Sequence, residues 1–165
     1  MDRCAECGFE YDETQSSAAA STIIEGVGGI ASTLTDGARD LRARKQPHTW
    51  SPLEYGCHVR DVLLVQRERV LAARRTNRPS FEPMGRDERV EHDGYKDQDP
   101  TDVARELRDA ARLFANVLQR LAPEDWSRTV VYSYPKPWER SLRWVAVHTV
   151  HEVRHHTLDV NRQLA

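Results

Sequence analysis

Four of the seven histidines lie within nine residues near the C-terminus, at His148, His151, His155 and His156. Small or apolar residues recur every three or four positions through this stretch, which predicts an amphipathic helix. His151 and His155 are four residues apart, so one helical turn places both imidazoles on the same side. Two imidazoles at this spacing can bind one divalent ion, which needs at least one further protein ligand. The pair therefore predicts a metal site that another part of the chain must complete.

A candidate for the third ligand lies in an earlier predicted helix. Ser51, Pro52 and Glu54 form its start signal, with an N-cap serine, a proline at the first helical position and a capping-box glutamate. His58 follows in the second turn beside apolar residues, and the helix is expected to extend to about Arg75. A lone histidine on such a face is usually a hydrogen-bonded core residue, so His58 becomes a ligand candidate only together with the C-terminal pair.

Two carboxylates on the C-terminal helix are candidates to orient the ligand rings. Asp159 is one turn beyond His155, and Glu152 directly follows His151. A carboxylate that accepts a hydrogen bond from a ligating imidazole sets its tautomer and its orientation. Glu152 points about 100° away from His151 around the helix, so a solvated helix position is the alternative for this residue.

The segment from His151 to His155 also matches the H-E-x-x-H motif of zinc peptidases. In those enzymes the glutamate is the general base and a third ligand lies downstream. Only ten residues follow His155, and its neighbours His156 and Asp159 are too near in sequence to serve as that ligand. We therefore reject the peptidase interpretation.

The composition excludes several classes of protein. With 165 residues and 39% apolar content, the chain is long enough for one domain with a real core. The formal net charge is −2 with acidic and basic residues interspersed, so no basic patch indicates a nucleic-acid partner. No apolar run approaches the ~20 residues of a membrane span, and the N-terminus lacks the apolar core of a signal peptide. We expect a cytoplasmic protein that binds neither membrane nor nucleic acid.

The apolar spacing predicts four long helices. The glycines at positions 26, 28 and 29 of the first helix allow either the close approach of a neighbouring helix or a break. Four amphipathic helices with one long crossover loop predict an all-α four-helix bundle over residues 17–165, preceded by a tail of residues 1–16. The helices are expected at 17–44, 51–75, 101–122 and 139–165, with a polar loop at 76–100 and a short extended segment at 129–134.

The predicted loop 76–100 is long for a small domain, and loops of this length are often functional. It contains Arg86 and Arg89, which are candidates to bind an anionic substrate or cofactor. The alternative is a surface loop that its apolar residues attach to the bundle.

The cysteines leave several interpretations open. Their odd number, three, argues against a secreted disulfide framework. Cys4 and Cys7 form a C-x-x-C-G turn of the type that supplies half of a zinc knuckle, but the only further cysteine is Cys57. The pair is a redox-active dithiol, two ligands of a metal completed by residues elsewhere, or a remnant without a present role.

The segments 50–61 and 151–156 resemble the DinB/YfiT-like superfamily, whose members are described as metal-dependent enzymes. Its members are four-helix bundles with one histidine on the second helix and an H-x-x-x-H pair on the last helix. The resemblance implies that His58, His151 and His155 bind one divalent ion, with His148 and His156 outside the coordination sphere.

The resemblance covers about residues 17–164, and neither the cysteine tail nor Cys57 is part of the family pattern. Residues 83–90 and 98–100 look like the actinobacterial branch of the superfamily. That branch includes relatives of mycothiol-dependent maleylpyruvate isomerase, and related Bacillus proteins act as bacillithiol transferases.

Three imidazoles with an open position are typical of a catalytic zinc site, which lowers the pKa of a bound water or thiol. We expect a thiol-dependent S-transferase or isomerase of the mycothiol type that acts on a small molecule. Its cofactors would be one divalent ion, zinc before nickel or iron, and a low-molecular-weight thiol. The alternatives are a metal-dependent hydrolase and a non-catalytic metal-binding or redox-sensing module. A homodimer is left open.

The N-terminal cysteines are also within reach of this site. About ten residues separate Cys7 from the first predicted helix, and they can extend to about 30 Å at ~3.3 Å per residue. The tail must then enter at the end of the bundle that holds His58. We hypothesise that Cys4 or Cys7 contacts the metal, or that the two form a disulfide that controls access to it.

Overall fold

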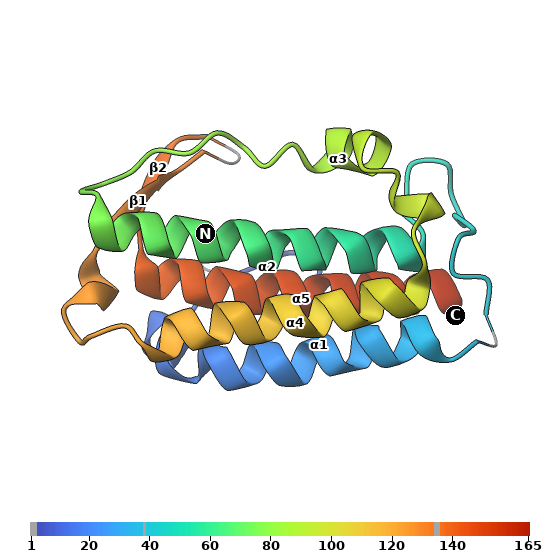
Figure 1. Cartoon of the computed structure of the whole chain (residues 1–165), viewed down its shortest axis with the longest axis horizontal. Helices are drawn as coiled ribbons and strands as arrows, with labels where there is room; N and C mark the ends of the chain where they lie inside the picture. The colour runs from blue at the N-terminus through green and yellow to red at the C-terminus, as the bar shows by residue number, and fades with distance from the viewer. Residues whose placement is uncertain (1–2, 38, 134–135) are drawn as a thin grey trace.

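The computed structural model describes residues 3–37, 39–133 and 136–165. Four long helices form a bundle in which α1 packs against α4 and α5, and α2 packs against the same two helices (Figure 1). The predicted four-helix bundle is therefore confirmed. Within the described ranges, no helix has the length and apolar character of a membrane span. The long helices are α1 (Ala19–Thr35), α2 (Pro52–Arg75), α4 (Pro100–Gln119) and α5 (Leu142–Leu164). The 3-10 helix η1 (Glu13–Ala18) precedes α1, and the 3-10 helix η3 (Asp125–Ser127) follows α4.

Capping side chains set where three of these helices begin. Ser51 accepts a hydrogen bond from the Glu54 backbone N–H, and the Glu54 carboxylate accepts one from the Ser51 N–H at 2.7 Å. This capping box and the end of α2 at residue 75 confirm the prediction for that helix. Asp99 caps α4 and Ser141 caps α5 in the same way, by accepting backbone N–H groups that have no partner inside the helix.

The first helix is shorter than its apolar spacing predicted. It ends at Thr35 and not near residue 44, and Gly37 follows in the left-handed region with φ 67°. Leu41, the last residue of the apolar spacing that predicted this helix, is buried although it lies in a loop. A Cβ on Gly26 would lie 2.8 Å from the Val153 Cγ1 atom. Of the two roles predicted for the glycines, close packing of α1 against α5 is the one observed at Gly26.

The connection from α2 to α4 crosses the length of the bundle. Figure 1 shows both helices running in the same direction, so the chain must return between them. The prediction of an irregular loop at 76–100 was wrong in part, because this segment contains α3 (Arg86–His92) and the 3-10 helix η2 (Tyr95–Asp97). Gly85 precedes α3 with a left-handed φ of 66°. Seven residues are too few to produce a clear helical period in the sequence.

A β-hairpin precedes the last helix. The strands β1 (Thr129–Tyr132) and β2 (Trp138–Ser141) are antiparallel, with Thr129 opposite Ser141. The predicted extended segment corresponds to β1, and its expected end at Tyr134 lies outside the described residues. The last helix begins at Leu142 and not near Glu139. Residues 138–141 pair with β1 before Ser141 caps α5, which the helical spacing of the following residues did not reveal.

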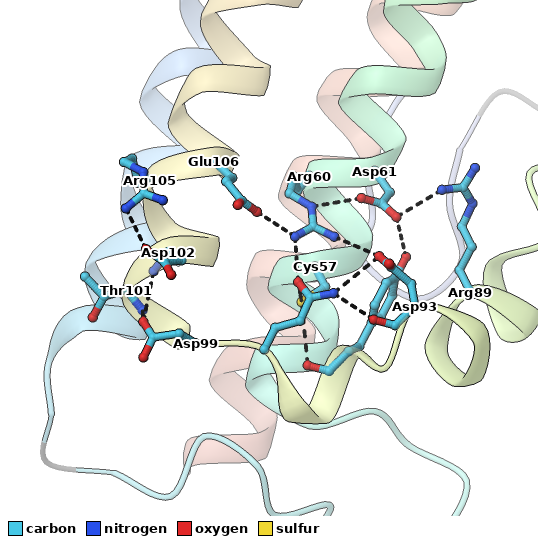
Figure 2. Close-up of polar contacts among 12 residues, drawn as sticks. Cys57, Arg60, Asp61, Arg89, Asp93, Asp99, Thr101, Asp102, Arg105 and Glu106 are labelled. Carbon is cyan, nitrogen blue, oxygen red and sulfur yellow. Dashed lines mark hydrogen bonds and ion pairs between the residues drawn. The ribbon is translucent and has the colours of Figure 1, made fainter.

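A buried ion cluster around Asp61 attaches the crossover to the bundle (Figure 2). Asp61 is 5% exposed and accepts hydrogen bonds from Arg60 at 2.9 Å, Arg89 at 3.1 Å and the Tyr95 hydroxyl at 2.7 Å. Arg60 also donates to Glu106 of α4 at 2.8 Å. The cluster therefore connects α2 to α3, η2 and α4. The Arg89 guanidinium is one of its members and stabilises the fold.

We predict that Asp61→Ala destabilises the protein by about 3 kcal/mol, because it leaves the buried Arg60 guanidinium short of a partner. The matched control is Asp102→Ala, which removes an exposed ion pair with Arg105 and should cost at most about 1 kcal/mol. Urea unfolding followed by circular dichroism measures both. Equal losses in the two variants would show that the Asp61 cluster does not hold the crossover.

Candidate functional site

The histidine-rich face of α5 borders a cavity of about 510 Å³. Its walls come from α2, α5, the start of α3, the β-hairpin and the N-terminal segment 4–11. A volume of this size is within the range of small-molecule sites. The lining residues that bear on chemistry include Tyr11, His58, Arg69, His148, Glu152 and His156.

The Glu152 carboxylate lies among four imidazoles on the wall of this cavity. Its Oε1 atom is 3.6 Å from His148 Nε2 and 3.5 Å from His151 Nδ1. Its Oε2 atom is 3.9 Å from His58 Nε2 and 3.6 Å from His156 Nε2. Only 20% of the side chain is exposed. Of the two positions that the sequence left open for Glu152, the structure shows the one that faces the histidines.

Burial and the neighbouring charges shift the pKa values of Glu152, His156 and His148. Burial by itself raises the pKa of Glu152, but the close approach of the imidazoles of His151, His156 and His58 outweighs it and holds the pKa well below its usual range. Burial opposes protonation of His156, but the carboxylates of Asp159 and Glu152 raise its pKa to about 9. For His148, burial prevails and lowers the pKa to about 4. The metal-free site at neutral pH thus holds an ionised Glu152, a cationic His156 and a neutral His148.

One group of side chains can hold a metal ion at the cavity. His58, Glu152 and His156 each offer a ligand atom, and these atoms all lie within 4.8 Å of one another. His58 is 2% exposed, yet its Nδ1 atom has no hydrogen-bond partner among the described residues. The Nδ1 atom of His156 lies 3.0 Å from Asp159 Oδ2, which orients that ring in the way outer carboxylates orient metal ligands.

A second group lies beside the first one. Cys4, Cys7, His151 and His155 also offer ligand atoms within 4.8 Å of one another. Two further combinations of three residues reuse members of these two groups with His148 or Asp159.

The structure thus distributes the predicted ligands His58, His151 and His155 over two neighbouring groups. His151 and His155 do lie together, with ring centroids 5.2 Å apart, whereas His58 is grouped with His156. Coordination of a single ion by His58, His151 and His155 stays a prediction. His156, expected outside the coordination sphere, lies beside His58, with ring centroids 4.8 Å apart.

Comparison with known proteins identifies the family. A sequence model of the DinB superfamily matches residues 29–160, which is most of the chain. The chain belongs to the DinB superfamily. YfiT from Bacillus subtilis, described as a probable metal-dependent hydrolase with an unusual four-helix bundle topology, has a similar fold. The TM-score is 0.80 at 16% identity, over 92% of this chain and 87% of that chain. A search of curated proteins finds no match.

The N-terminal segment contributes to the cavity although it precedes the region matched by the DinB model. The Tyr11 hydroxyl lies 3.0 Å from His148 Nδ1 and 2.8 Å from His151 Nδ1. Burial raises the pKa of Tyr11 above its ordinary value, so the hydroxyl stays protonated and can donate to one of these rings. Phe9 is 9% exposed and packs against the His151 ring. Neither residue was among the predicted site residues; aromatic side chains in an otherwise polar tail were the available signal.

Arg69 of α2, which was not among the predicted site residues either, reaches the cavity from a buried position. The residue is 5% exposed, and its guanidinium stacks over the Tyr132 ring at 4.5 Å. It donates to Gln66 and to the Glu82 carbonyl, while its Nε atom has no hydrogen-bond partner in the part of the chain that the structure describes. Among the described residues, no carboxylate lies within ion-pair distance of it. A buried cation that the protein itself leaves uncompensated favours an anionic ligand in the cavity.

The arginines predicted to bind an anion lie in different surroundings. Arg86 lines the cavity and forms an ion pair with Asp87 at 3.6 Å. Arg89 is engaged by Asp61 at 3.1 Å and by the Met84 carbonyl at 2.8 Å. Their role as ligand-binding residues stays a prediction, for which Arg86 has the more suitable position.

We predict that Asp159→Asn lowers the pKa of His156 in the metal-free protein from about 9 toward the ordinary value near ~6.5. A raised folded-state pKa contributes stability that is complete below the unfolded pKa and is lost as the pH rises through the folded one. The variant should therefore lose stability mainly below about pH 9. NMR titration of the imidazole resonances after chelator treatment measures the shift. Asp36→Asn, at an exposed carboxylate at the end of α1, is the control and should leave the His156 titration unchanged.

Proposed function

We propose that this DinB-superfamily protein is a metal-dependent enzyme whose ion is held by His58, Glu152 and His156 at the wall of the cavity. The preferred reaction is the transfer of a low-molecular-weight thiol of the mycothiol type to a small anionic substrate, or a thiol-dependent isomerisation. Zinc is the expected metal, with nickel or iron as alternatives. The observation that carries the proposal is the grouping of three ligand atoms beside a cavity of about 510 Å³.

The residues present suit a divalent ion. Two imidazoles and one carboxylate form a ligand set found in catalytic zinc sites, which keep a further position for water or substrate. The His58 ring is buried, and the distance of 3.9 Å from its Nε2 to Glu152 Oε2 is too long for a hydrogen bond. An ion bound at this Nε2 atom would give it a partner and would neutralise the Glu152 carboxylate.

A divalent ion at these ligands supplies Lewis acidity and lowers the pKa of a coordinated water or thiol. The chain itself supplies orientation and charge. Asp159 fixes the His156 ring through Nδ1, and the Tyr11 hydroxyl bridges His148 and His151 on the same wall. Arg69 presents a cation to the cavity, where it can bind a carboxylate of the substrate or of the thiol.

The charge of the cavity supports a thiol over water as the nucleophile, because Arg69 offers a cation there. Low-molecular-weight thiols carry polar or carboxylate groups that a buried guanidinium can bind. Hydrolysis is the second candidate, and the description of YfiT as a probable metal-dependent hydrolase favours it.

We predict that zinc-loaded protein conjugates mycothiol to electrophilic test substrates, and that chelation abolishes this activity. His156→Ala should lower the rate by more than about 100-fold, beyond the ~10–100-fold typical of outer hydrogen-bond partners of a metal site. The exposed His48→Ala is the control and should be fully active. Product analysis with and without mycothiol separates the two reactions, because metal-dependent turnover in water alone would identify a hydrolase. No metal-dependent reaction of either kind would contradict the proposal.

We predict that Arg69→Gln raises KM for carboxylate-bearing ligands by at least about 10-fold, because one charge-assisted hydrogen bond contributes about 1.5–3 kcal/mol. The control is Arg105→Gln, at an exposed position on α4, with an unchanged KM. Steady-state kinetics on a carboxylate and on its neutral amide analogue provide the test. If Arg69→Gln affects both ligands equally, Arg69 acts on the fold and not on the anion.

A further inference from the structure

We propose that Cys4, Cys7, His151 and His155 form a second metal site, a closed four-ligand zinc site that fastens the N-terminal segment to α5. This site is distinct from the proposed catalytic one and does not depend on it. The four ligand atoms lie within 4.8 Å of one another. Two thiolates and two imidazoles are a ligand set of structural zinc sites, which leave no position open to substrate.

The contact between Cys4 and His155 fits a tetrahedral ion. Zinc–sulfur and zinc–nitrogen bonds of about 2.3 and 2.0–2.1 Å place sulfur and nitrogen about 3.6 Å apart at the tetrahedral angle. The Cys4 Sγ atom lies 3.7 Å from His155 Nδ1. This separation is long for a strong hydrogen bond and close to the edge of a zinc tetrahedron.

The cysteine turn already has a conformation that presents both sulfurs. The Gly8 N–H donates to the Cys4 carbonyl at 2.9 Å, and the Cys4 N–H donates to the Phe9 carbonyl at 2.8 Å. Gly8 has a left-handed φ of 70°, which an L-residue adopts only with strain. The two histidines are one turn apart on α5, so the cysteine turn and the helix each supply two of the four ligands.

The His151 ring indicates which of its nitrogens is available. Its Nδ1 atom is 2.8 Å from the Tyr11 hydroxyl, whereas its Nε2 atom is buried without a hydrogen-bond partner among the described residues. His151 as a whole is 8% exposed. A buried nitrogen without a partner is costly, and coordination of an ion beside the cysteines would satisfy it. Tyr11 would then orient the ring from the other side.

The helix keeps the two sites apart. One site uses His151 and His155, and the other uses Glu152 and His156, so the two pairs differ by one residue and by about 100° around the helix axis. The two pairs therefore point toward two different ion positions. Zinc binding at the cysteines releases their thiol protons to solvent and involves no oxidation.

The test is metal binding by the full chain with cobalt as the spectroscopic probe. Reduced, metal-free protein should bind two Co²⁺ per chain, and one of them should show a thiolate-to-cobalt charge-transfer band with tetrahedral d–d bands. The double variant Cys4→Ser/Cys7→Ser should bind one ion and lose the charge-transfer band. His155→Gln, which leaves the tail sequence intact, should weaken the same site. Cys57→Ser is the matched control and should keep two ions and the band.

The two proposals fail in different ways in this experiment. His156→Ala should lose one ion and keep the thiolate band. Filling of the thiolate site alone would leave the present inference standing and overturn the catalytic site. Binding of a single ion without a thiolate band, or a band that persists in the double serine variant, would overturn the second site.

Alkylation of the cysteines provides an independent readout. Zinc binding should slow the alkylation of Cys4 and Cys7 by iodoacetamide at least about 10-fold, because the thiolate electron pair that attacks iodoacetamide is then donated to the metal. Burial raises the pKa of Cys57 to about 12, so this cysteine should react slowly in both states and serves as the internal reference. Equal alkylation of Cys4 and Cys7 with and without zinc would contradict the proposal.

Discussion

The burial of the Glu152 carboxylate is the constraint on which the site depends. A carboxylate withdrawn from water must be compensated by charge or by hydrogen bonds. Here the compensation comes from histidines of both α2 and α5, with His58 on one side and His148, His151 and His156 on the other. On the cavity side, α2 and α5 therefore meet through polar side chains. Elsewhere their buried side chains belong to the apolar core. It also concentrates ligand atoms that a divalent ion can use.

The last helix presents two ligand pairs to two different neighbours. Glu152 and His156 face α2 and the cavity, while His151 and His155 face the N-terminal segment. In our proposals, the first pair serves chemistry and the second fastens a segment that supplies Tyr11 to the cavity wall. In these proposals, loss of zinc from the cysteines changes the cavity and leaves the ligands of the catalytic ion in place, because the segment 4–11 forms one of the cavity walls.

The crossover between α2 and α4 forms part of the cavity wall. Because α2 and α4 run in the same direction (Figure 1), the connecting segment must return along the bundle, and there it covers the cavity with α3. The ions around Asp61 fix this segment at its far end. Arg89 is part of that attachment, so the cation available in the cavity from α2 is Arg69, whose charge no described carboxylate compensates.

The sequence by itself determined what depends on local chemistry. Ser51 and Glu54 cap α2 wherever the helix packs, the spacing of His151 and His155 places both on one helical side, and the amphipathic pattern requires a bundle. Which histidine joins His58 was decided only by tertiary packing. A shift of one residue rotates a helix face by about 100°, and the apolar pattern of α5 does not define its rotation that finely. The same holds for Cys4 and Cys7, because the path of an N-terminal segment depends on where Phe9 and Tyr11 find a surface to pack against.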